Sequence, residues 1–461
     1  MDLRLHLVIL LLVLTALGIA ARSLQRFLSR RQCARRHRCQ PVAKCSSKDP
    51  FLGLDTIPGT IRAVRGHRIL QRGCELFRQY GNTFTPFKPL LGEGIFNTDG
   101  EHWASSRALI RPSFARDQVA DLSLLEGLIQ DLFVLLPRDG RTIDLQGLFF
   151  LYTLDSATKF LFGQSVGMLK KEKSTIESGM LERSTREPSF ADAFYYSQQA
   201  VLTRSMLGPL SVFYRDQKAD KCNHICRGFA QQFVDEAINA AETCELASRT
   251  SDSRRILDEL MNVLLAGRDT TASLLSNLFF VLAKNPQIWT KLRDEVSVLQ
   301  GQPPTYKQLR GLKYTQLCVN ESLRLHPVVP RNERRAIRDT VLPLDGGKDG
   351  LAPVFVPKGT LIAYNIYAMH RRADLYGPDA EEFRPERWED GMLQPRWGYL
   401  PFNGGSRICI GQRYALTEVS YVLVRMVQEF RALESRDPGP LEESLALTLF
   451  SRNGAKVGLI P

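Results

Sequence analysis

The spacing of apolar residues along this chain is helical over most of its length. In residues 66–81 (GHRILQRGCELFRQYG) and 116–136 (RDQVADLSLLEGLIQDLFVLL), apolar positions recur every three or four residues, as on one face of a helix. Asp117 is placed to cap the second of these helices, and Pro137 follows its end. Residues 150–163 (FLYTLDSATKFLFG) predict a further helix that ends at a glycine.

Strand patterns are few and come late in the chain. Strand patterns occur at residues 340–344 (TVLPL), 352–365 (APVFVPKGTLIAYN) and 445–450 (LALTLF). The sequence contains no internal repeat and no long low-complexity tract. The pattern therefore predicts a mainly α fold with a small β component.

The first 58 residues differ in composition from the rest. Residues 5–21 (LHLVILLLVLTALGIAA) are apolar except for one histidine and one threonine, and a cluster of arginines follows them. About 17 apolar residues is the lower limit for a helix that spans a membrane, and basic residues behind it favour a cytosolic location for the rest. We therefore predict a membrane anchor over 1–21, a basic linker over 22–58 and one large domain over 59–461.

A cleaved secretory signal is the alternative interpretation of this N-terminus, since small residues end the apolar run. The arginines argue against export, and so do the nine cysteines, which form no Cys-x-x-Cys pair and indicate a reducing compartment. The net charge of +12 would also suit nucleic acid. Because many arginines flank an apolar segment, a membrane surface is the simpler partner.

Residues 253–285 predict a long, buried helix with a polar interruption. The interruption is AGRDTTA, residues 266–272, where Gly267 weakens the helix and threonine hydroxyls can bond back to a carbonyl and bend it. Two interpretations stay open. Asp269 and Thr270 could relay protons to a molecule bound against the helix, or the small residues could mark a crossing point between packed helices.

Three charged residues farther along could form one network. Glu321 and Arg324 are three apart on a predicted helix, so they share a face, although such pairs on a surface are common and weak. Arg387 lies in FRPERW, residues 383–388. If Arg387 joined the other two, a buried and fully bonded network could fix a loop in place.

A single cysteine stands in a glycine-rich loop, PFNGGSRICIGQ, residues 401–412, directly before a helical pattern. Backbone N–H groups of such a loop and the start of the next helix can hold a thiolate charge. A phosphate loop lacks its Gly-Lys-Ser/Thr here, and a zinc site lacks further ligands. His326 and His370 have no evident pairing with Cys409 as in a nucleophilic site. An axial thiolate to haem iron needs one cysteine only.

These motifs, in this order, resemble the cytochrome P450 family of haem-thiolate monooxygenases. The cysteine loop fits that family's signature Phe-x-x-Gly-x-Arg-x-Cys-x-Gly, and AGRDTT resembles its oxygen-activating motif. ESLR and PERW resemble its Glu-x-x-Arg and Pro-Glu-Arg motifs, and Trp103 and Arg107 in HWASSR resemble a pair that touches a haem propionate. The resemblance covers essentially the whole chain and implies the cytochrome P450 fold for residues 59–461.

Longer stretches resemble the fungal n-alkane and fatty-acid ω-hydroxylases. They are residues 89–126, 154–166 and 263–276. This resemblance implies a long-chain alkane or fatty acid hydroxylated near its terminal carbon, and a fungal source. The alternatives are the same haem chemistry on another lipid or a xenobiotic, and a shortened, catalytically silent relative that does not bind haem.

Carried over position by position, the resemblance implies haem b as cofactor, with Cys409 as the axial ligand of its iron. It implies that Asp269 and Thr270 deliver protons during oxygen activation and that Phe402 packs near the thiolate. Gly405 and Gly411 would shape the loop. The other matching residues are Arg407, Trp103 and Arg107, which would hold the propionates, and Glu321, Arg324 and Arg387, which would hold the loop's fold.

The resemblance also implies partners and a location. The chain has no flavin or nicotinamide fingerprint, so electrons would come from NADPH through cytochrome P450 reductase. The reaction would use O2 and a small apolar substrate, and no nucleic acid. The catalytic domain would face the cytosol from the endoplasmic reticulum membrane.

The chain departs from the family pattern in two places. The resemblance predicts that segments are missing near residues 84–87 and near 243–250, and the first loss would reduce the main β-sheet. The cysteine loop lies outside both departures.

Overall fold

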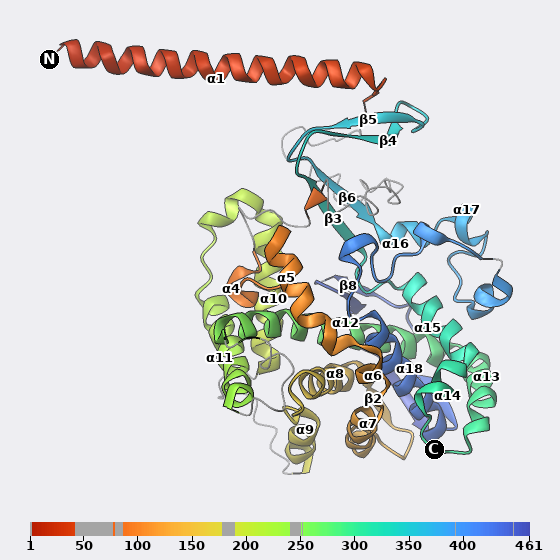
Figure 1. Ribbon diagram of the computed structural model, residues 1–461. Coiled ribbons are helices and arrows are strands. Elements are labelled where there is room, and N and C mark those ends of the chain that lie inside the picture. Colours follow the sequence, from red (N-terminus) through yellow and green to blue (C-terminus); the bar gives the residue numbers. More distant parts are fainter. Residues whose placement is uncertain are drawn as a thin grey trace. The chain divides into compact units, whose positions relative to one another are not determined.

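The computed structural model describes residues 2–41, 77–78, 86–177, 190–239, 250, 252–391, 393–445 and 447–461 (Figure 1). It confirms the mainly α fold with small sheets. The chain divides into two compact units, residues 1–79 with 333–364 and residues 80–332 with 365–461. Residues 333–364 group with the N-terminal part of the chain, and the boundaries 1–21, 22–58 and 59–461 stay predictions.

The first unit begins with one long helix, α1 (Asp2–Arg36). While residues 42–58 of the predicted linker lie outside the described residues, residues 22–36 of it are helical and continue α1. The physical reason is that no glycine or proline interrupts the sequence between Gly18 and Pro41. The helix ends where Arg38 adopts a left-handed conformation, with φ +52°.

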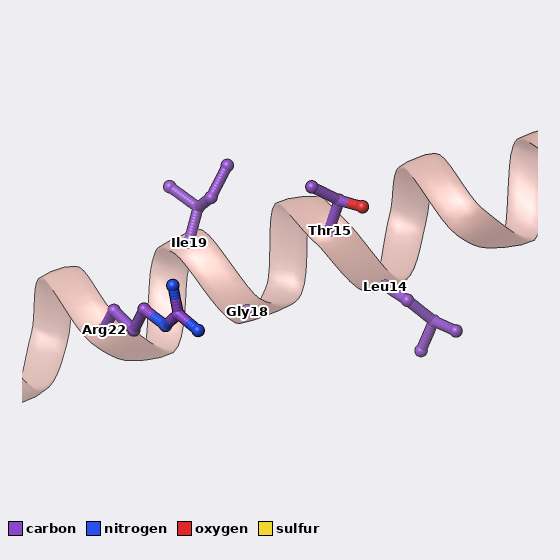
Figure 2. A pocket seen from close by; sticks show the side chains of 5 residues that line it. All are labelled: Leu14, Thr15, Gly18, Ile19 and Arg22. Atoms are coloured by element: carbon purple, nitrogen blue, oxygen red, sulfur yellow. The ribbon is translucent and has the colours of Figure 1, made fainter.

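The apolar side chains of α1 are exposed. Among them are Leu14, Leu17 and Ile19, each about 60% exposed. Figure 2 shows the shallow hollow that Leu14, Thr15, Gly18, Ile19 and Arg22 line on this helix, where Gly18 carries no side chain. Among the residues that the structure describes, no helix combines the length and the apolar character needed to cross a membrane.

The strands of the first unit form two small sheets. A three-stranded sheet has the order β1-β3-β6, and β4 pairs with β5 in an antiparallel hairpin. The runs expected at 340–344 and 352–365 correspond to β4, β5 and β6. The strands are β1 (Phe77–Arg78), β3 (Arg331–Ala336), β4 (Thr340–Gly346), β5 (Ala352–Val356) and β6 (Leu361–Asn365).

The second unit is a bundle of helices around α12 (Ser253–Lys284), which is buried along most of its length. The Asp252 side chain caps this helix by accepting the Arg255 N–H at 3.1 Å, and Pro286 begins the next helix directly after it. The helices packed against α12 include α8 (Leu145–Phe162), α11 (Gln217–Asn239), α13 (Pro286–Val296), α15 (Lys313–Leu325) and α18 (Gln412–Glu429).

One helix expected over residues 116–136 is interrupted. The structure has α6 (Arg116–Ala120) and α7 (Ser123–Leu135) instead. The break lies at Asp121, whose carboxylate accepts both the N–H and the hydroxyl of Ser123, at 3.0 and 2.6 Å. This local bond competes with helix continuation, so Asp121 rather than Asp117 supplies the polar turn.

The second unit contains further helices and short strands. The helices are α4 (Lys88–Leu91), α5 (Gly100–Ile110), α9 (Met168–Glu177), α10 (Phe190–Leu207), α14 (Tyr306–Gly311), α16 (Ile366–Met369) and α17 (Ala373–Tyr376). The strands are β2 (Thr142–Asp144), β7 (Ala432–Ser435), β8 (Glu443–Leu445), β9 (Leu449–Ser451) and β10 (Lys456–Ile460). They form a β2-β10-β7 sheet and a β8-β9 pair.

Candidate functional site

The cysteine loop closes tightly on itself just before α18. The Cys409 N–H donates to the carbonyl oxygen of Phe402 at 3.0 Å, which fixes both ends of the glycine-rich turn. Gly405 has φ +73°, a conformation that favours glycine. A Cβ on Gly411 would come within 3.2 Å of the Phe114 ring, so the backbone is close to that side chain. The loop therefore has one shape, with the thiol three residues before the first residue of α18.

The Cys409 thiol is accessible to solvent, although protein atoms surround it densely. Burial among these atoms raises the pKa of the thiol, while the Gly411 N–H and the positive charge of Arg107 oppose that rise. A hydrogen bond to the sulfur and a nearby cation are the features that favour a thiolate ligand.

Two arginines gather around one tryptophan beside this loop. The Arg407 guanidinium lies 4.4 Å from the centre of the Trp103 ring, and that of Arg107 lies 5.9 Å from it. Arg107 also donates to the Ile408 carbonyl oxygen at 3.0 Å, so α5 is bonded to the cysteine loop. The three residues expected to hold anionic groups of one ligand thus meet next to the thiol.

The polar interruption of α12 is buried. Asp269 forms an ion pair with Arg268, with Nη1 and Oδ1 2.7 Å apart. Burial raises the pKa of the Asp269 carboxyl, while the Arg268 charge and a hydrogen bond with the Gln198 side chain oppose that rise. Thr270 donates its hydroxyl to the Ala266 carbonyl oxygen at 2.6 Å, one turn earlier. Asp269 is thus buried and Thr270 is half-buried, and each side chain has its own partner.

The small residues of this stretch also serve packing. A Cβ on Gly267 would lie 3.4 Å from the Ala157 side chain of α8. Thr153 of the same helix donates to the Arg268 carbonyl oxygen at 2.8 Å. Gly267 therefore lies where α8 and α12 pack closely, as the crossing-point interpretation predicts. The roles of Asp269 and Thr270 in proton delivery stay proposals.

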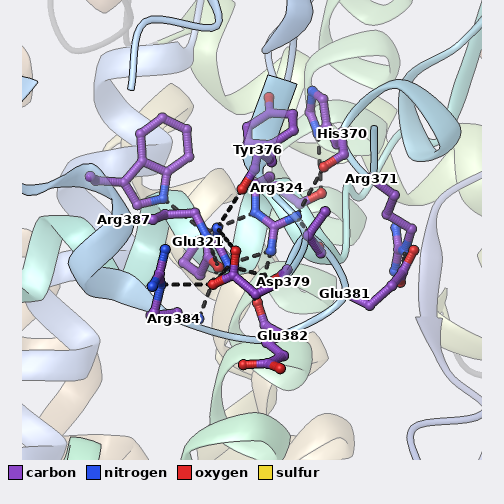
Figure 3. A network of polar contacts seen from close by, with 12 residues as sticks. Glu321, Arg324, His370, Arg371, Tyr376, Asp379, Glu381, Glu382, Arg384 and Arg387 are labelled. Atoms are coloured by element: carbon purple, nitrogen blue, oxygen red, sulfur yellow. Dashed lines mark hydrogen bonds and ion pairs between the residues drawn. The ribbon is translucent and has the colours of Figure 1, made fainter. Parts of the chain in front are cut away.

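Glu321, Arg324 and Arg387 meet in one buried network (Figure 3). Arg324 binds Glu321 through two bonds of 2.9 Å, and Arg387 Nε donates to Glu321 Oε1 at 2.7 Å. The Glu321 carboxylate also accepts the indole N–H of Trp388 at 2.9 Å and the Arg384 N–H at 2.9 Å. Both arginines also donate hydrogen bonds to backbone carbonyl oxygens. The donors of the guanidinium groups therefore have partners, as buried charged groups require.

His370 connects this network to the segment before the cysteine loop. Its Nδ1 lies 3.2 Å from the Arg324 carbonyl oxygen, and its Nε2 accepts the Leu400 N–H at 2.8 Å. Burial lowers the pKa of His370 to about 3, so the imidazole is neutral and Nδ1 carries the proton. Sequence reasoning found no role for His370, because its partners lie 46 and 30 positions away.

A buried acid lies on α18, behind the loop. Glu418 is 2% exposed, and burial raises its pKa from 4.5 to about 8, with the Ser156 hydroxyl opposing the rise. Between these values the folded chain holds a proton that the unfolded chain has released, so stability falls as the pH rises through this window. We expect Glu418→Gln to remove that dependence and to raise the melting temperature most at pH 8.

Thermal unfolding of both proteins from pH 5 to pH 8 measures this effect. If the melting temperatures of the two proteins depended on pH in the same way, Glu418 would not be the group that holds the proton.

Comparison with known proteins points to one family. The sequence matches the family described as Cytochrome P450 over residues 65–457. Cytochrome P450 monooxygenase himC of Aspergillus japonicus is 44% identical over 476 aligned positions, which cover 91% of this chain and 84% of that protein. Cytochrome P450 monooxygenase FPY7 of Fusarium mangiferae is 40% identical over 515 positions, with 99% and 96% covered. Cytochrome P450 52A3-A of Candida maltosa is 45% identical over 394 positions, with 80% and 74% covered.

Two of these alignments are longer than the chain itself. They run over 476 and 515 positions, against 461 residues here. Those relatives therefore carry residues that have no counterpart in this chain. The shortenings predicted near 84–87 and 243–250 fall largely outside the described residues, so their positions stay predictions.

Proposed function

This chain belongs to the cytochrome P450 family of monooxygenases, and from that premise we propose that it hydroxylates long-chain alkanes or fatty acids near the terminal carbon. The observation that carries the chemistry is the closed Cys409 loop, with an N–H on the sulfur and two arginines beside it. The substrate class rests on the resemblance of three long stretches to the fungal ω-hydroxylases.

Haem b is the cofactor of this family, and the residues present suit it. A porphyrin with two propionates needs one axial donor and cations at its edge. Cys409 offers the donor, and Arg407, Arg107 and Trp103 cluster within reach of one another beside it. When bound, haem supplies the activation of O2 and the insertion of one oxygen atom into a C–H bond.

In this proposal the cysteine loop and its supports have separate tasks. Cys409 would bind the haem iron, while Phe402 closes the loop and packs its half-buried ring against the core. Gly405 and Gly411 let the backbone adopt the loop's shape. The buried network of Glu321, Arg324 and Arg387 touches no ligand and holds the fold that leads into the loop through His370.

Asp269 and Thr270 are the proposed proton carriers. Asn at position 269 keeps the shape of the side chain but cannot carry a proton, so Asp269→Asn should lower the turnover number about 100-fold. Thr270→Ala should lower it less and should increase the share of NADPH consumed without product. Product formation and NADPH oxidation measured together distinguish the two effects.

Ser276→Ala is the matched control for Thr270→Ala. Ser276 makes the same bond to a carbonyl four residues earlier, at 2.6 Å, and lies outside AGRDTT. If Thr270→Ala and Ser276→Ala had the same turnover number and formed the same amount of product per NADPH consumed, the Thr270 hydroxyl would have no role in proton delivery.

Electron supply and location complete the proposal. Electrons come from NADPH through cytochrome P450 reductase, and the basic net charge of +12 would steer an acidic partner surface. The protein attaches to the endoplasmic reticulum membrane through α1, whose exposed apolar residues and following arginines suit a lipid surface. The catalytic part then works in the cytosol.

A substrate panel tests the proposed reaction. The purified chain with reductase and NADPH is given n-alkanes and fatty acids of increasing length, other lipids and xenobiotics. We expect terminal or near-terminal alcohols, with a rate maximum at long chains. Product from other lipids or xenobiotics alone would contradict the substrate class, and a chain without haem would contradict the activity altogether.

A further inference from the structure

The residue before the proposed proton carrier on α12 is a buried arginine. Arg268 is 6% exposed, and its Nη1 lies 2.7 Å from Asp269 Oδ1. Successive residues of an α-helix point about 100° apart, and their side chains do not face each other. The bond between these two neighbours therefore needs support from outside α12, because the helix itself does not bring their side chains together.

Two other helices supply that support. The Arg268 guanidinium carbon lies 5.0 Å from the centre of the Phe150 ring of α8 and 5.5 Å from the centre of the Phe194 ring of α10. Phe194 is fully buried and Phe150 is half-buried. Aromatic rings attract a guanidinium, and the attraction is stronger where water is excluded. The two rings thus place the guanidinium next to Asp269.

The same two helices hold the backbone of Arg268 and the carboxyl of Asp269. Thr153 of α8 donates its hydroxyl to the Arg268 carbonyl oxygen at 2.8 Å. The Gln198 side chain of α10, which is 4% exposed, is hydrogen-bonded to the Asp269 carboxyl. Phe194 and Gln198 are four positions apart on α10, so they lie on the same face of that helix. One face of α10 therefore contacts both members of the ion pair.

The charge of Arg268 determines the charge of the carboxyl beside it. A guanidinium stays protonated in proteins, so a neutral Asp269 would leave Arg268 as an unpaired cation in the interior. Burial raises the pKa of the Asp269 carboxyl, and the Arg268 charge is the strongest influence that lowers it. The ionised form of Asp269 is therefore stable in this site only as long as the arginine is present.

The side chains around the pair carry no charge of their own near neutral pH. From α8 and α10 the pair meets two aromatic rings and the Gln198 amide. The Arg268 charge also acts on the Cys226 thiol of α11, where burial raises the pKa to about 12 and keeps the thiol neutral. Among these groups, the Asp269 carboxylate is the one that balances the Arg268 charge.

We propose that Arg268 is a positioning residue that keeps Asp269 ionised and in place between proton transfers, and that the rings of Phe150 and Phe194 hold Arg268 there. This inference rests on the proposed function, in which Asp269 carries protons. In each cycle the carboxyl gives up one proton, and the carboxylate that remains takes one proton back from the solvent. Arg268 stabilises that carboxylate and itself neither gives nor takes a proton.

The first test compares Arg268→Met with Arg268→Lys. Methionine keeps much of the side chain's volume but removes the charge, so burial raises the pKa of the Asp269 carboxyl further. The part of the pH–rate profile that depends on Asp269 should then move to higher pH by roughly one unit, and turnover at pH 7 should fall about tenfold, because the carboxyl keeps its proton. Arg268→Lys retains a cation and should restore most of the turnover and the original profile.

Arg425→Met is the matched control for Arg268→Met. Arg425 is 7% exposed, its Nε donates to Glu126 Oε2 at 3.0 Å, and its guanidinium lies 5.9 Å from the centre of the Phe133 ring. Its replacement should lower the stability but leave the pH–rate profile where it is. A profile that moved equally in Arg268→Met and Arg425→Met, or that moved in neither, would overturn the proposal.

Thermal unfolding tests the pair without any turnover. Arg268→Met and Asp269→Asn each leave one buried charge without its partner, so each should lower the melting temperature at pH 7. The double variant has no charge left to pair, so its loss should be smaller than the sum of the two single losses. If the two losses simply added, Arg268 would not keep Asp269 ionised, and the inference would be wrong. If the unaltered protein makes no product from alkanes or fatty acids, the proposed function fails, and the unfolding experiment still decides the role of Arg268.

Discussion

An Arg324→Met variant is expected to lose most of the stability of the second unit. Arg324 is fully buried, and besides Glu321 it donates to the carbonyl oxygens of His370 and Ala380, at 2.9 and 2.6 Å, and of Glu382 at 3.0 Å. Methionine fills much of the volume and satisfies none of these acceptors. Breaking one partner of a buried ion pair costs about 3–5 kcal/mol, which is comparable to the total stability of many domains.

Denaturant unfolding and the yield of haem-containing protein measure this effect. The control is Arg452→Met, because Arg452 forms an exposed pair with Glu442 at 3.7 Å and should cost less than about 1 kcal/mol. If the two variants unfolded at the same denaturant concentration, the network would not support the fold as described.

A Cys409→Ala variant is expected to lose product formation completely. Alanine keeps the loop's backbone, including the bond of residue 409 to the Phe402 carbonyl oxygen, and removes only the sulfur. The folded protein should therefore remain, while the axial donor is lost. Turnover with the preferred substrate should fall to the level seen without enzyme.

Cys33→Ala is the matched control for this experiment. Cys33 is a half-buried thiol on α1, outside the second unit, and its replacement should leave turnover unchanged. Retained turnover in Cys409→Ala would remove the basis of the proposed site.

The sequence predicts those helix ends that depend on a single residue close by in the chain. The end of α8 at Gly163 and the end of α12 before Pro286 follow from single residues, and the structure has both. The sequence does not predict the break between α6 and α7. Asp117 and Asp121 are both able to cap a helix, and the sequence does not show which of them does so; the structure has the bond between Asp121 and Ser123. The basic composition of residues 22–36 favours a linker, but arginine is also a good helix former, and these residues continue α1.

Contacts between distant residues could be predicted only as hypotheses. The meeting of Arg387 with Glu321 is predicted only as a hypothesis, because the two residues lie in separate motifs 66 positions apart. The bonds of Arg407 to Thr98 and Asp99 join residues about 300 positions apart, and no periodicity or spacing indicates them. The same holds for His370. Its neutral ring is hydrogen-bonded to two distant backbone groups, and a histidine alone in the sequence does not predict such a structural role.

The carbon monoxide difference spectrum of the reduced protein tests the central claim most directly. The account predicts the red-shifted Soret band of a thiolate-ligated haem, because the Cys409 loop is closed and its sulfur is accessible. A purified, folded chain that showed no haem absorbance, or a haem band without thiolate character, would contradict it.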